Sequence, residues 1–254
     1  MCGLVVVVNL LGNPVDSRQL KRMTDTIRHR GPDDEGFFVK GPLGFGFRRL
    51  SILDLSPAGH QPMTVADGQV TIVFNGEIFN YVELRKELSA LGHHFVSTGD
   101  TEVLLHAYLE WGRDCLSRLN GMWAFAIYDN RTGKIFGSRD RFGIKPLYRY
   151  RDAEQVLFAS EIKSIRLADR YSHQTNWTVA ADYLLRARLD ETDQTFFADI
   201  EKVGAGCAFE LDFAGNYREW RYWSLPSFEE SDASCPDLEY DELFESAMEL
   251  HMRS

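Results

Sequence analysis

The sequence has few cysteines, and they show none of the spacings that cysteine-based sites require. The four lie far apart and form no Cys-x-x-Cys pair: Cys2, Cys115, Cys207 and Cys235. Disulfide scaffolds and zinc ribbons depend on closely spaced pairs. The pattern therefore favours a reduced, cytoplasmic protein, and we predict no metal site.

Long hydrophobic runs are also lacking. The longest early run, residues 4–8, ends at Asn9 and has no basic segment before it. It is too short to span a bilayer and wrongly flanked for a signal peptide. A short β-branched run of this kind is typical of a buried strand. We therefore expect no membrane partner.

The sequence is also short of positive charge. It has 28 Lys and Arg residues against 38 Asp and Glu residues, which gives a net charge of −10. Nucleic acid binding needs a basic surface, so we expect no nucleic acid partner. The charge is uneven, because residues 225–254 carry nine acidic residues and one Arg. The rest of the chain is close to neutral, which makes this exclusion weaker than the net charge suggests.

What the sequence does contain is an ordinary globular composition, 44% hydrophobic and 26% charged, without an internal repeat. Helices are predicted from Ser17 as N-cap, from Asn80 in a capping-box-like start to Gly92, and from Asp100 to Gly112. A further helix is expected near 179–185. Strand-like runs alternate with these helices at 4–10, 37–39, 43–47, 70–74, 122–128, 134–137, 146–150, 156–159, 208–211 and 217–223. Hairpin links between such runs indicate an α+β fold with antiparallel sheets.

The composition changes after Ser224. Residues 225–236 are rich in Pro, Ser and acidic side chains, which indicates a linker, and 238–252 is amphipathic. Its apolar stripe needs a surface to pack on: Tyr240, Leu243, Phe244, Ala247 and Met248. We therefore divide the chain into a domain at 2–224 and an acidic linker with a first helix at 225–254.

Cys2 directly follows the initiator methionine and precedes Gly3. Methionine is normally trimmed before a residue this small, so we predict a mature chain that begins with cysteine. Such a residue carries a nucleophile beside an amine whose reference pKa is about 7.7–8.0, and the amine can accept the thiol proton. Taken alone, a cysteine here is more often just a small residue near a terminus.

Seven ordered motifs strengthen the catalytic interpretation. They are His29-Arg30-Gly31-Pro32-Asp33, Arg49-Leu50-Ser51-Ile52, Asn75-Gly76-Glu77-Ile78-Phe79-Asn80, Gly99-Asp100-Thr101-Glu102-Val103, Gly121-Met122-Trp123-Ala124-Phe125-Ala126, Arg139-Asp140-Arg141-Phe142-Gly143-Ile144-Lys145-Pro146-Leu147-Tyr148 and Ala159-Ser160-Glu161-Ile162-Lys163. With Cys2-Gly3, this series resembles the glutaminase domain of glutamine-hydrolysing asparagine synthetases, which are N-terminal-nucleophile (class II) glutamine amidotransferases. The resemblance extends from Cys2 to about Glu210.

The resemblance implies a four-layer αββα sandwich of two antiparallel sheets, and it implies roles for several residues. Cys2 attacks the glutamine side-chain amide to form a thioester, and Asn75 and Gly76 form the oxyanion hole. The alternative for Asn75-Gly76 is a type I′ hairpin turn, for which Asn-Gly is a favoured pair.

The resemblance also implies a substrate pocket. Arg49 pairs with the α-carboxylate of glutamine, Leu50 and Ile52 line the pocket, and Glu77 and Asp100 bind the α-ammonium. Asp100 has an equally good structural interpretation as a helix N-cap. Arg30 and Asp33 are expected to hold the loop near the nucleophile rather than to touch substrate, and His29 is expected to be structural.

The sequence contains no Ser-Gly-Gly-x-Asp-Ser phosphate loop and no Walker A loop. We therefore expect no cofactor in this chain, with ATP and Mg²⁺ used only by a synthetase domain or separate subunit. That partner would amidate aspartate with the ammonia released here. Three alternatives remain open: a standalone amidotransferase, an enzyme of another branch with a different acceptor, and a glutamine-binding regulatory module with little turnover. A homodimer is a further candidate assembly.

Overall fold

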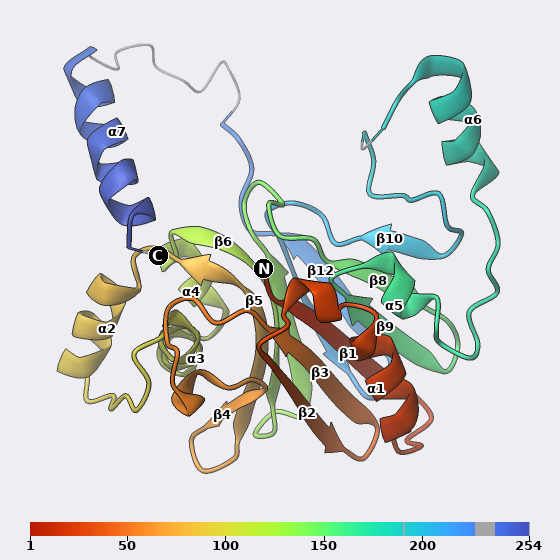
Figure 1. Cartoon of the computed structure of the whole chain (residues 1–254), viewed down its shortest axis with the longest axis horizontal. Coiled ribbons are helices and arrows are strands. Elements are labelled where there is room, and N and C mark those ends of the chain that lie inside the picture. Colours follow the sequence, from red (N-terminus) through yellow and green to blue (C-terminus); the bar gives the residue numbers. More distant parts are fainter. Residues whose placement is uncertain (190, 227–236, 254) are drawn as a thin grey trace.

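The computed structural model describes residues 1–189, 191–226 and 237–253, and its body consists of two antiparallel sheets (Figure 1). The strand order of the first sheet is β10-β8-β9-β1-β3-β2, and that of the second is β12-β11-β7-β6-β5-β4. The first sheet comprises β1 (Gly3–Asn9), β2 (Asp34–Lys40), β3 (Leu43–Arg49), β8 (Tyr148–Arg151), β9 (Gln155–Ala159) and β10 (Ile200–Lys202). The second comprises β4 (Met63–Val65), β5 (Val70–Ile78), β6 (Gly121–Asp129), β7 (Lys134–Arg139), β11 (Cys207–Asp212) and β12 (Tyr217–Arg221).

The helices of the described residues are α1 (Ser17–Asp25), α2 (Tyr81–Ala90), α3 (Asp100–Trp111), α4 (Cys115–Arg118), α5 (Ile162–Ile165), α6 (Trp177–Arg186) and α7 (Asp237–His251). Helices α1 and α5 pack on the outer face of the first sheet and α3 packs on that of the second, whereas α6 and α7 extend away from the sheets (Figure 1). The predicted helix from Asp100 is confirmed, and it ends where Gly112 adopts a positive φ of 57°. None of the described helices is long and apolar enough to cross a membrane.

Strand β1 explains how the layers stack. Because side chains alternate along a strand, Val6 packs between the sheets with Val73 of β5, whereas Val5 packs under Leu20 of α1. The run at residues 4–8 is continuously hydrophobic because both faces of β1 are buried. On the far side, β6 and β5 pack against α3 through residues such as Leu104. The layers are therefore helix, sheet, sheet, helix, which confirms the predicted αββα sandwich.

Two helix starts differ from the sequence prediction. The N-cap of α1 is Asp16, whose carboxylate accepts a hydrogen bond from Arg18 N at 2.8 Å, and Ser17 is already helical. Asn80 precedes α2 but makes no capping hydrogen bond. Its side chain instead pairs with the main chain before β6, at Arg118 O and Asn120 N, both at 2.9 Å. The side chain thus serves a tertiary contact that local sequence does not reveal.

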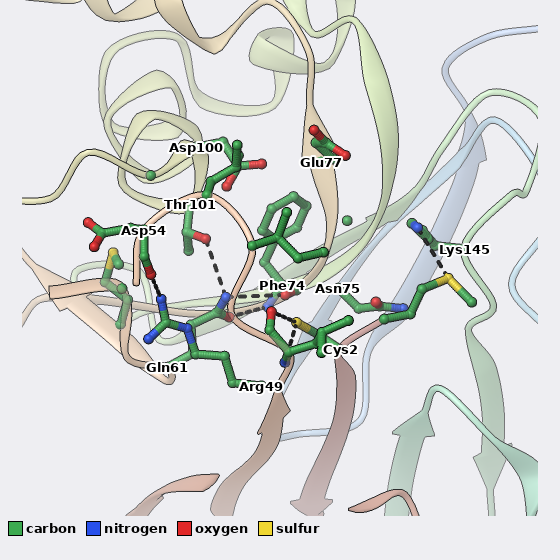
Figure 2. A pocket seen from close by; sticks show the side chains of 18 of the residues that line it. Cys2, Arg49, Asp54, Gln61, Phe74, Asn75, Glu77, Asp100, Thr101 and Lys145 are labelled. Carbon is green, nitrogen blue, oxygen red and sulfur yellow. Dashed lines mark hydrogen bonds between the residues drawn. The ribbon is translucent and has the colours of Figure 1, made fainter. Parts of the chain in front are cut away.

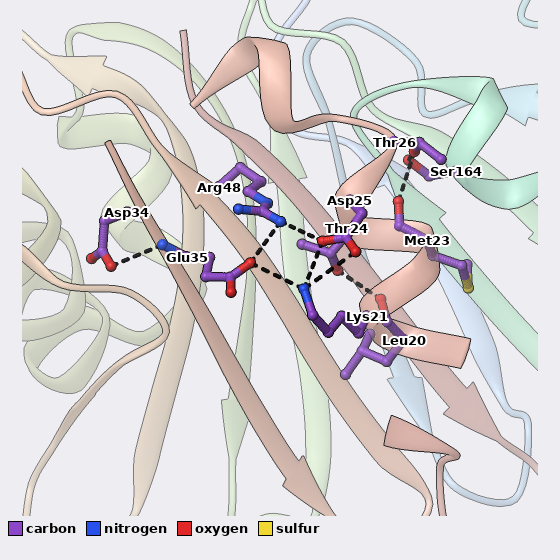
Figure 3. A network of polar contacts seen from close by, with 10 residues as sticks. All are labelled: Leu20, Lys21, Met23, Thr24, Asp25, Thr26, Asp34, Glu35, Arg48 and Ser164. Carbon is purple, nitrogen blue, oxygen red and sulfur yellow. Dashed lines mark hydrogen bonds and ion pairs between the residues drawn. The ribbon is translucent and has the colours of Figure 1, made fainter. Parts of the chain in front are cut away.

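Arg48 links α1 to the first sheet through ion pairs (Figure 3). It is buried on β3, and its guanidinium pairs with Asp25 of α1 and with Glu35 of β2, the latter at 2.6 Å. Lys21 joins the same carboxylates, 2.9 Å from Asp25 and 3.5 Å from Glu35. Because neighbouring side chains on a strand point to opposite faces, Arg49 must project toward the other side.

The end of α7 contacts the region between β5 and α2. Arg253 forms an ion pair with Glu83, with contacts of 2.6 and 2.7 Å, and the rings of His251 and Phe79 lie 4.1 Å apart. The predicted apolar stripe includes four exposed side chains: Tyr240, Leu243, Phe244 and Met248. The predicted linker at 225–236 lies outside the described residues from 227 onward.

Candidate active site

A cavity of about 200 Å³ lies where β1, β3 and β5 meet the start of α3. Eight of the residues singled out from the sequence line it: Cys2, Arg49, Leu50, Ile52, Asn75, Gly76, Glu77 and Asp100. They come from segments up to 98 positions apart in the chain, yet the fold gathers them around one space (Figure 2). Arg30 and Asp33, predicted to act outside the pocket, do not line it.

Cys2 lies directly before β1, with its thiol against the main chain of Leu50. Leu50 N donates to Cys2 Sγ at 3.3 Å, and the thiol faces Leu50 O at 3.5 Å. Burial raises the pKa of this thiol. Met1 is attached in this structure, so the nitrogen of Cys2 is a peptide amide here. A free amine at Cys2 requires removal of Met1.

Arg30 and Asp33 form hydrogen bonds to the main chain of Cys2 and of the loop beside it. Arg30 Nε donates to Cys2 O at 2.9 Å, and its Nη1 donates to Glu161 at 3.1 Å. Asp33 accepts a hydrogen bond from Ser51 N at 2.9 Å. These contacts are consistent with the predicted positioning role. His29 contacts Glu161 at 2.8 Å and does not line the cavity.

Arg49 is buried, and the loop that follows it holds its guanidinium. The guanidinium donates to Ser56 O at 3.2 Å and to Asp54 O. The Asp54 carboxylate organises this loop in turn, because it accepts hydrogen bonds from Ser56 N and Thr98 N, both at 2.8 Å. Burial raises the pKa of Asp54, but the hydrogen bond from Ser56 Oγ at 2.6 Å, together with these main-chain hydrogen bonds, lowers it to about 2. Arg49 is thus a fixed cation at one end of the cavity.

Asn75 and Gly76 lie inside β5, paired with Ala124 and Trp123 of β6. The hairpin-turn alternative is therefore excluded, and the strand extends to Ile78 rather than to Phe74. The side chain of Asn75 is 1% exposed, and its Nδ2 has no hydrogen-bond partner among the described residues. A buried amide donor without a partner is uncommon and calls for an explanation.

Gly76 is required by close packing and directs its amide to the cavity side. A Cβ at this position would lie 2.4 Å from Met122 O and 2.5 Å from the Phe74 ring. Alternate N–H groups of a strand point the same way. The N–H group of Phe74, two residues before Gly76, donates to the cavity residue Gln61. The N–H group of Ile78, two residues after it, donates to the cavity residue Asp100. The N–H of Gly76 therefore points toward the cavity.

Glu77 and Asp100 lie across the cavity from Cys2 and Arg49 (Figure 2). Asp100 is the first residue of α3, whose N-cap is Gly99, so the N-cap prediction for Asp100 is wrong by one position. Its carboxylate accepts a hydrogen bond from Ile78 N at 2.9 Å. Burial, with the nearby charge of Glu77 adding to it, raises the pKa of Asp100 to about 7.

The remaining cavity residues received no role from the sequence, and three of them carry polar side chains that matter below: Gln61, Thr101 and Lys145. Gln61 has no local signal, since its role depends on a strand 13 residues away. Thr101 and Lys145 lie within motifs that carried the resemblance, which was the available signal. No group of three or more His, Cys, Asp and Glu suited to a metal ion occurs within the described part of the chain.

The chain is similar to known proteins in both sequence and fold. A family model described as "Glutamine amidotransferase domain" matches residues 1–223. Asparagine synthetase [glutamine-hydrolyzing] 1 of Bacillus subtilis (strain 168) is 39% identical over 260 residues, covering 100% of this chain and 40% of that protein. Asparagine synthetase [glutamine-hydrolyzing] 3 of the same organism is 36% identical over 236 residues, covering 92% and 38%. The chain thus spans about two fifths of the length of these relatives.

The fold has a solved counterpart as well. Glutamine phosphoribosylpyrophosphate amidotransferase from B. subtilis superimposes with a TM-score of 0.65 at 18% identity, covering 89% of this chain and 50% of that one. This likeness concerns the fold alone. The family match over most of the chain and the identity to the two synthetases decide the assignment: the chain belongs to the glutamine amidotransferase domain family.

Proposed function

We propose that this domain hydrolyses the side-chain amide of glutamine to glutamate and ammonia, with Cys2 as the nucleophile. The observation that carries the proposal is the Nδ2 of Asn75, which has no partner in the described part of the chain and is buried in the same cavity as the Cys2 thiol. A buried donor kept free beside a nucleophile is what an oxyanion hole requires. The second donor is the N–H of Gly76.

The reaction begins after Met1 is removed. The α-amine of Cys2 takes the thiol proton, and Sγ attacks the amide carbon of glutamine. Negative charge then develops on the amide oxygen, where Asn75 and Gly76 donate to it. The C–N bond breaks as the ammonium of Cys2 returns its proton to the leaving nitrogen, which departs as ammonia. Water then cleaves the γ-glutamyl thioester to glutamate and the free thiol.

The charged residues explain why a free amino acid is the substrate. Arg49 offers a buried guanidinium to the α-carboxylate, a pairing suited to its planar fork. Glu77 and Asp100 offer carboxylates to the α-ammonium. Leu50 and Ile52 line the same cavity as these groups. With its charged head held by these groups, glutamine would present its side-chain amide to the nucleophile.

The ammonia acceptor is the second part of the proposal. The two Bacillus subtilis relatives are named asparagine synthetases and are much longer than this chain. We infer that a synthetase domain or separate subunit uses ATP and Mg²⁺ to activate aspartate, and that ammonia from Cys2 amidates it. Residues 2–224 would then be the glutaminase domain, and 225–254 would lead toward that partner.

A glutaminase assay tests the proposal directly. Mass spectrometry first establishes loss of Met1. Wild-type protein is then expected to release ammonia and glutamate from glutamine in equal amounts, whereas Cys2→Ala is inactive. Cys115→Ala removes a buried thiol outside the cavity and serves as the control. Full activity of Cys2→Ala would overturn the proposal, and so would tight glutamine binding by processed wild-type protein without ammonia release.

A further inference from the structure

Lys145 is a buried lysine in the cavity whose ammonium forms no ion pair within the described part of the chain. The residue is 5% exposed, and its Nζ contacts the thioether sulfur of Met1 at 3.3 Å (Figure 2). Burying a charge without a counter-ion is costly. A buried, perturbed titratable group in a cavity is therefore a candidate for a functional role.

The main chain around Lys145 is held rigidly. Asp140 accepts hydrogen bonds from Ile144 N and Lys145 N, both at 2.9 Å, and Arg139 Nε donates to Lys145 O at 2.8 Å. Asp140 also accepts from Trp123 N of β6 at 3.2 Å. The loop is thus tied to two strands of the second sheet, which fixes the base of the side chain at the cavity that Cys2 also lines.

The charges around the amino terminus come from several elements: Arg30, Asp33, Arg49, Glu77, Asp100 and Asp140. Burial lowers the pKa of Lys145, Glu77 opposes this shift, and Arg30 adds to it. The amine of Met1 behaves similarly. Burial lowers its pKa, Arg30 and Lys145 lower it further, and Asp33 opposes them. Two cations therefore act on the amino terminus together.

We propose that Lys145 is a positioning residue whose ammonium, freed from its thioether contact when Met1 is removed, keeps the α-amine of Cys2 neutral. A neutral amine can accept the thiol proton, whereas a protonated one cannot. A neighbouring cation disfavours a second ammonium by like-charge repulsion. Lys145 thereby acts through Cys2 without reacting itself. The catalytic meaning of this inference rests on the function proposed above.

The test measures the amine itself, without glutamine. Processed protein labelled with ¹⁵N at cysteine and glycine is titrated by NMR, and the Gly3 amide reports protonation of the neighbouring amine. In Lys145→Met the midpoint is expected to rise by roughly one pH unit relative to wild type. Lys145→Arg keeps the charge and retains most of the wild-type behaviour. Lys134→Met, an exposed site at the far end of β7, is the control and leaves the midpoint unchanged.

Kinetics supply the second readout. On the acid side, kcat/KM of Lys145→Met is expected to fall about tenfold for a one-unit shift, with KM little changed. Identical amine titrations in wild type and Lys145→Met overturn the inference. A shifted titration in a protein that releases no ammonia supports the electrostatic coupling and counts against the proposed function instead. If Lys145→Met does not fold, the amine titrations of Lys145→Gln and Lys145→Arg are compared instead. The midpoint is then expected to rise in Lys145→Gln and to stay close to wild type in Lys145→Arg, and equal midpoints in the two variants overturn the inference.

Discussion

Gln61 bonds to the main chain of Phe74 through both atoms of its side-chain amide. Phe74 N donates to Gln61 Oε1 at 2.7 Å, and Gln61 Nε2 donates to Phe74 O at 3.2 Å. The pairing of β4 with β5 reaches Met63 opposite Ile72, so Gln61 lies in register opposite Phe74, two residues beyond. Its side chain therefore replaces a backbone partner at the cavity wall. Nε2 also reaches Thr101 of α3 at 3.3 Å.

The first prediction concerns this contact. Gln61→Met keeps the side-chain volume but leaves the N–H and C=O of Phe74 without these partners. Leaving such groups unsatisfied costs about 1–3 kcal/mol each, so we expect the free energy of unfolding to fall by at least about 1 kcal/mol. Urea denaturation measures the change. Gln174→Met, at an exposed position, is the matched control. Equal loss in the two variants would contradict this role for Gln61.

Asn75→Ala separates catalysis from folding. Because Asn75 Nδ2 has no hydrogen-bond partner among the described residues, its removal breaks no hydrogen bond of that atom with them. We expect kcat to fall by about 10²–10³-fold, the loss typical of an oxyanion-hole donor, with KM changed little. Steady-state ammonia release and a thermal melt of the same preparation provide the two measurements. Unchanged kcat would remove Asn75 from the oxyanion hole.

If Asp100 binds the α-ammonium of glutamine as proposed, we expect binding to release a proton. With a pKa of about 7, roughly half of this carboxyl is protonated at pH 7, and an α-ammonium beside it favours the ionised form. Binding at pH 7 is therefore expected to release roughly half a proton. Calorimetry in two buffers of different ionisation enthalpy measures this release, with Cys2→Ala as the background that prevents turnover. Adding Asp100→Asn should abolish this contribution; an unchanged proton count would exclude Asp100 as its source.

The same residue gives stability a defined pH dependence. Its pKa is raised from 3.8 to about 7 in the folded protein, so the folded state holds a proton that the unfolded state has lost between these values. Its contribution to the free energy of unfolding is therefore full below about pH 4 and is lost as pH rises to about 7. Unfolding of Asp100→Asn should lack this component. Parallel pH profiles for wild type and variant would show that the carboxyl does not titrate in this window.

Much of the fold follows from local patterns. The β-branched run at residues 4–8 predicts β1, and Gly92 and Gly112 end their helices with positive φ angles. Such signals are readable because backbone conformation at a turn or cap depends on the nearest residues. Errors appear where a polar side chain has a distant alternative partner, as Asn80 does at Arg118 and Asn120.

By itself, the sequence predicted most of the strands and helices in their order, although not β4, β10, α4 or α5. Through its motifs it also indicated which residues to consider around Cys2. Only the tertiary structure decided that Asn75-Gly76 lies in a strand rather than a turn. It also decided that Arg48 faces α1 while Arg49 faces the cavity, and that Lys145 lies buried beside Met1. The physical reason is that partners far apart in the chain set burial, hydrogen-bond satisfaction and electrostatic field, and folding alone brings those partners together.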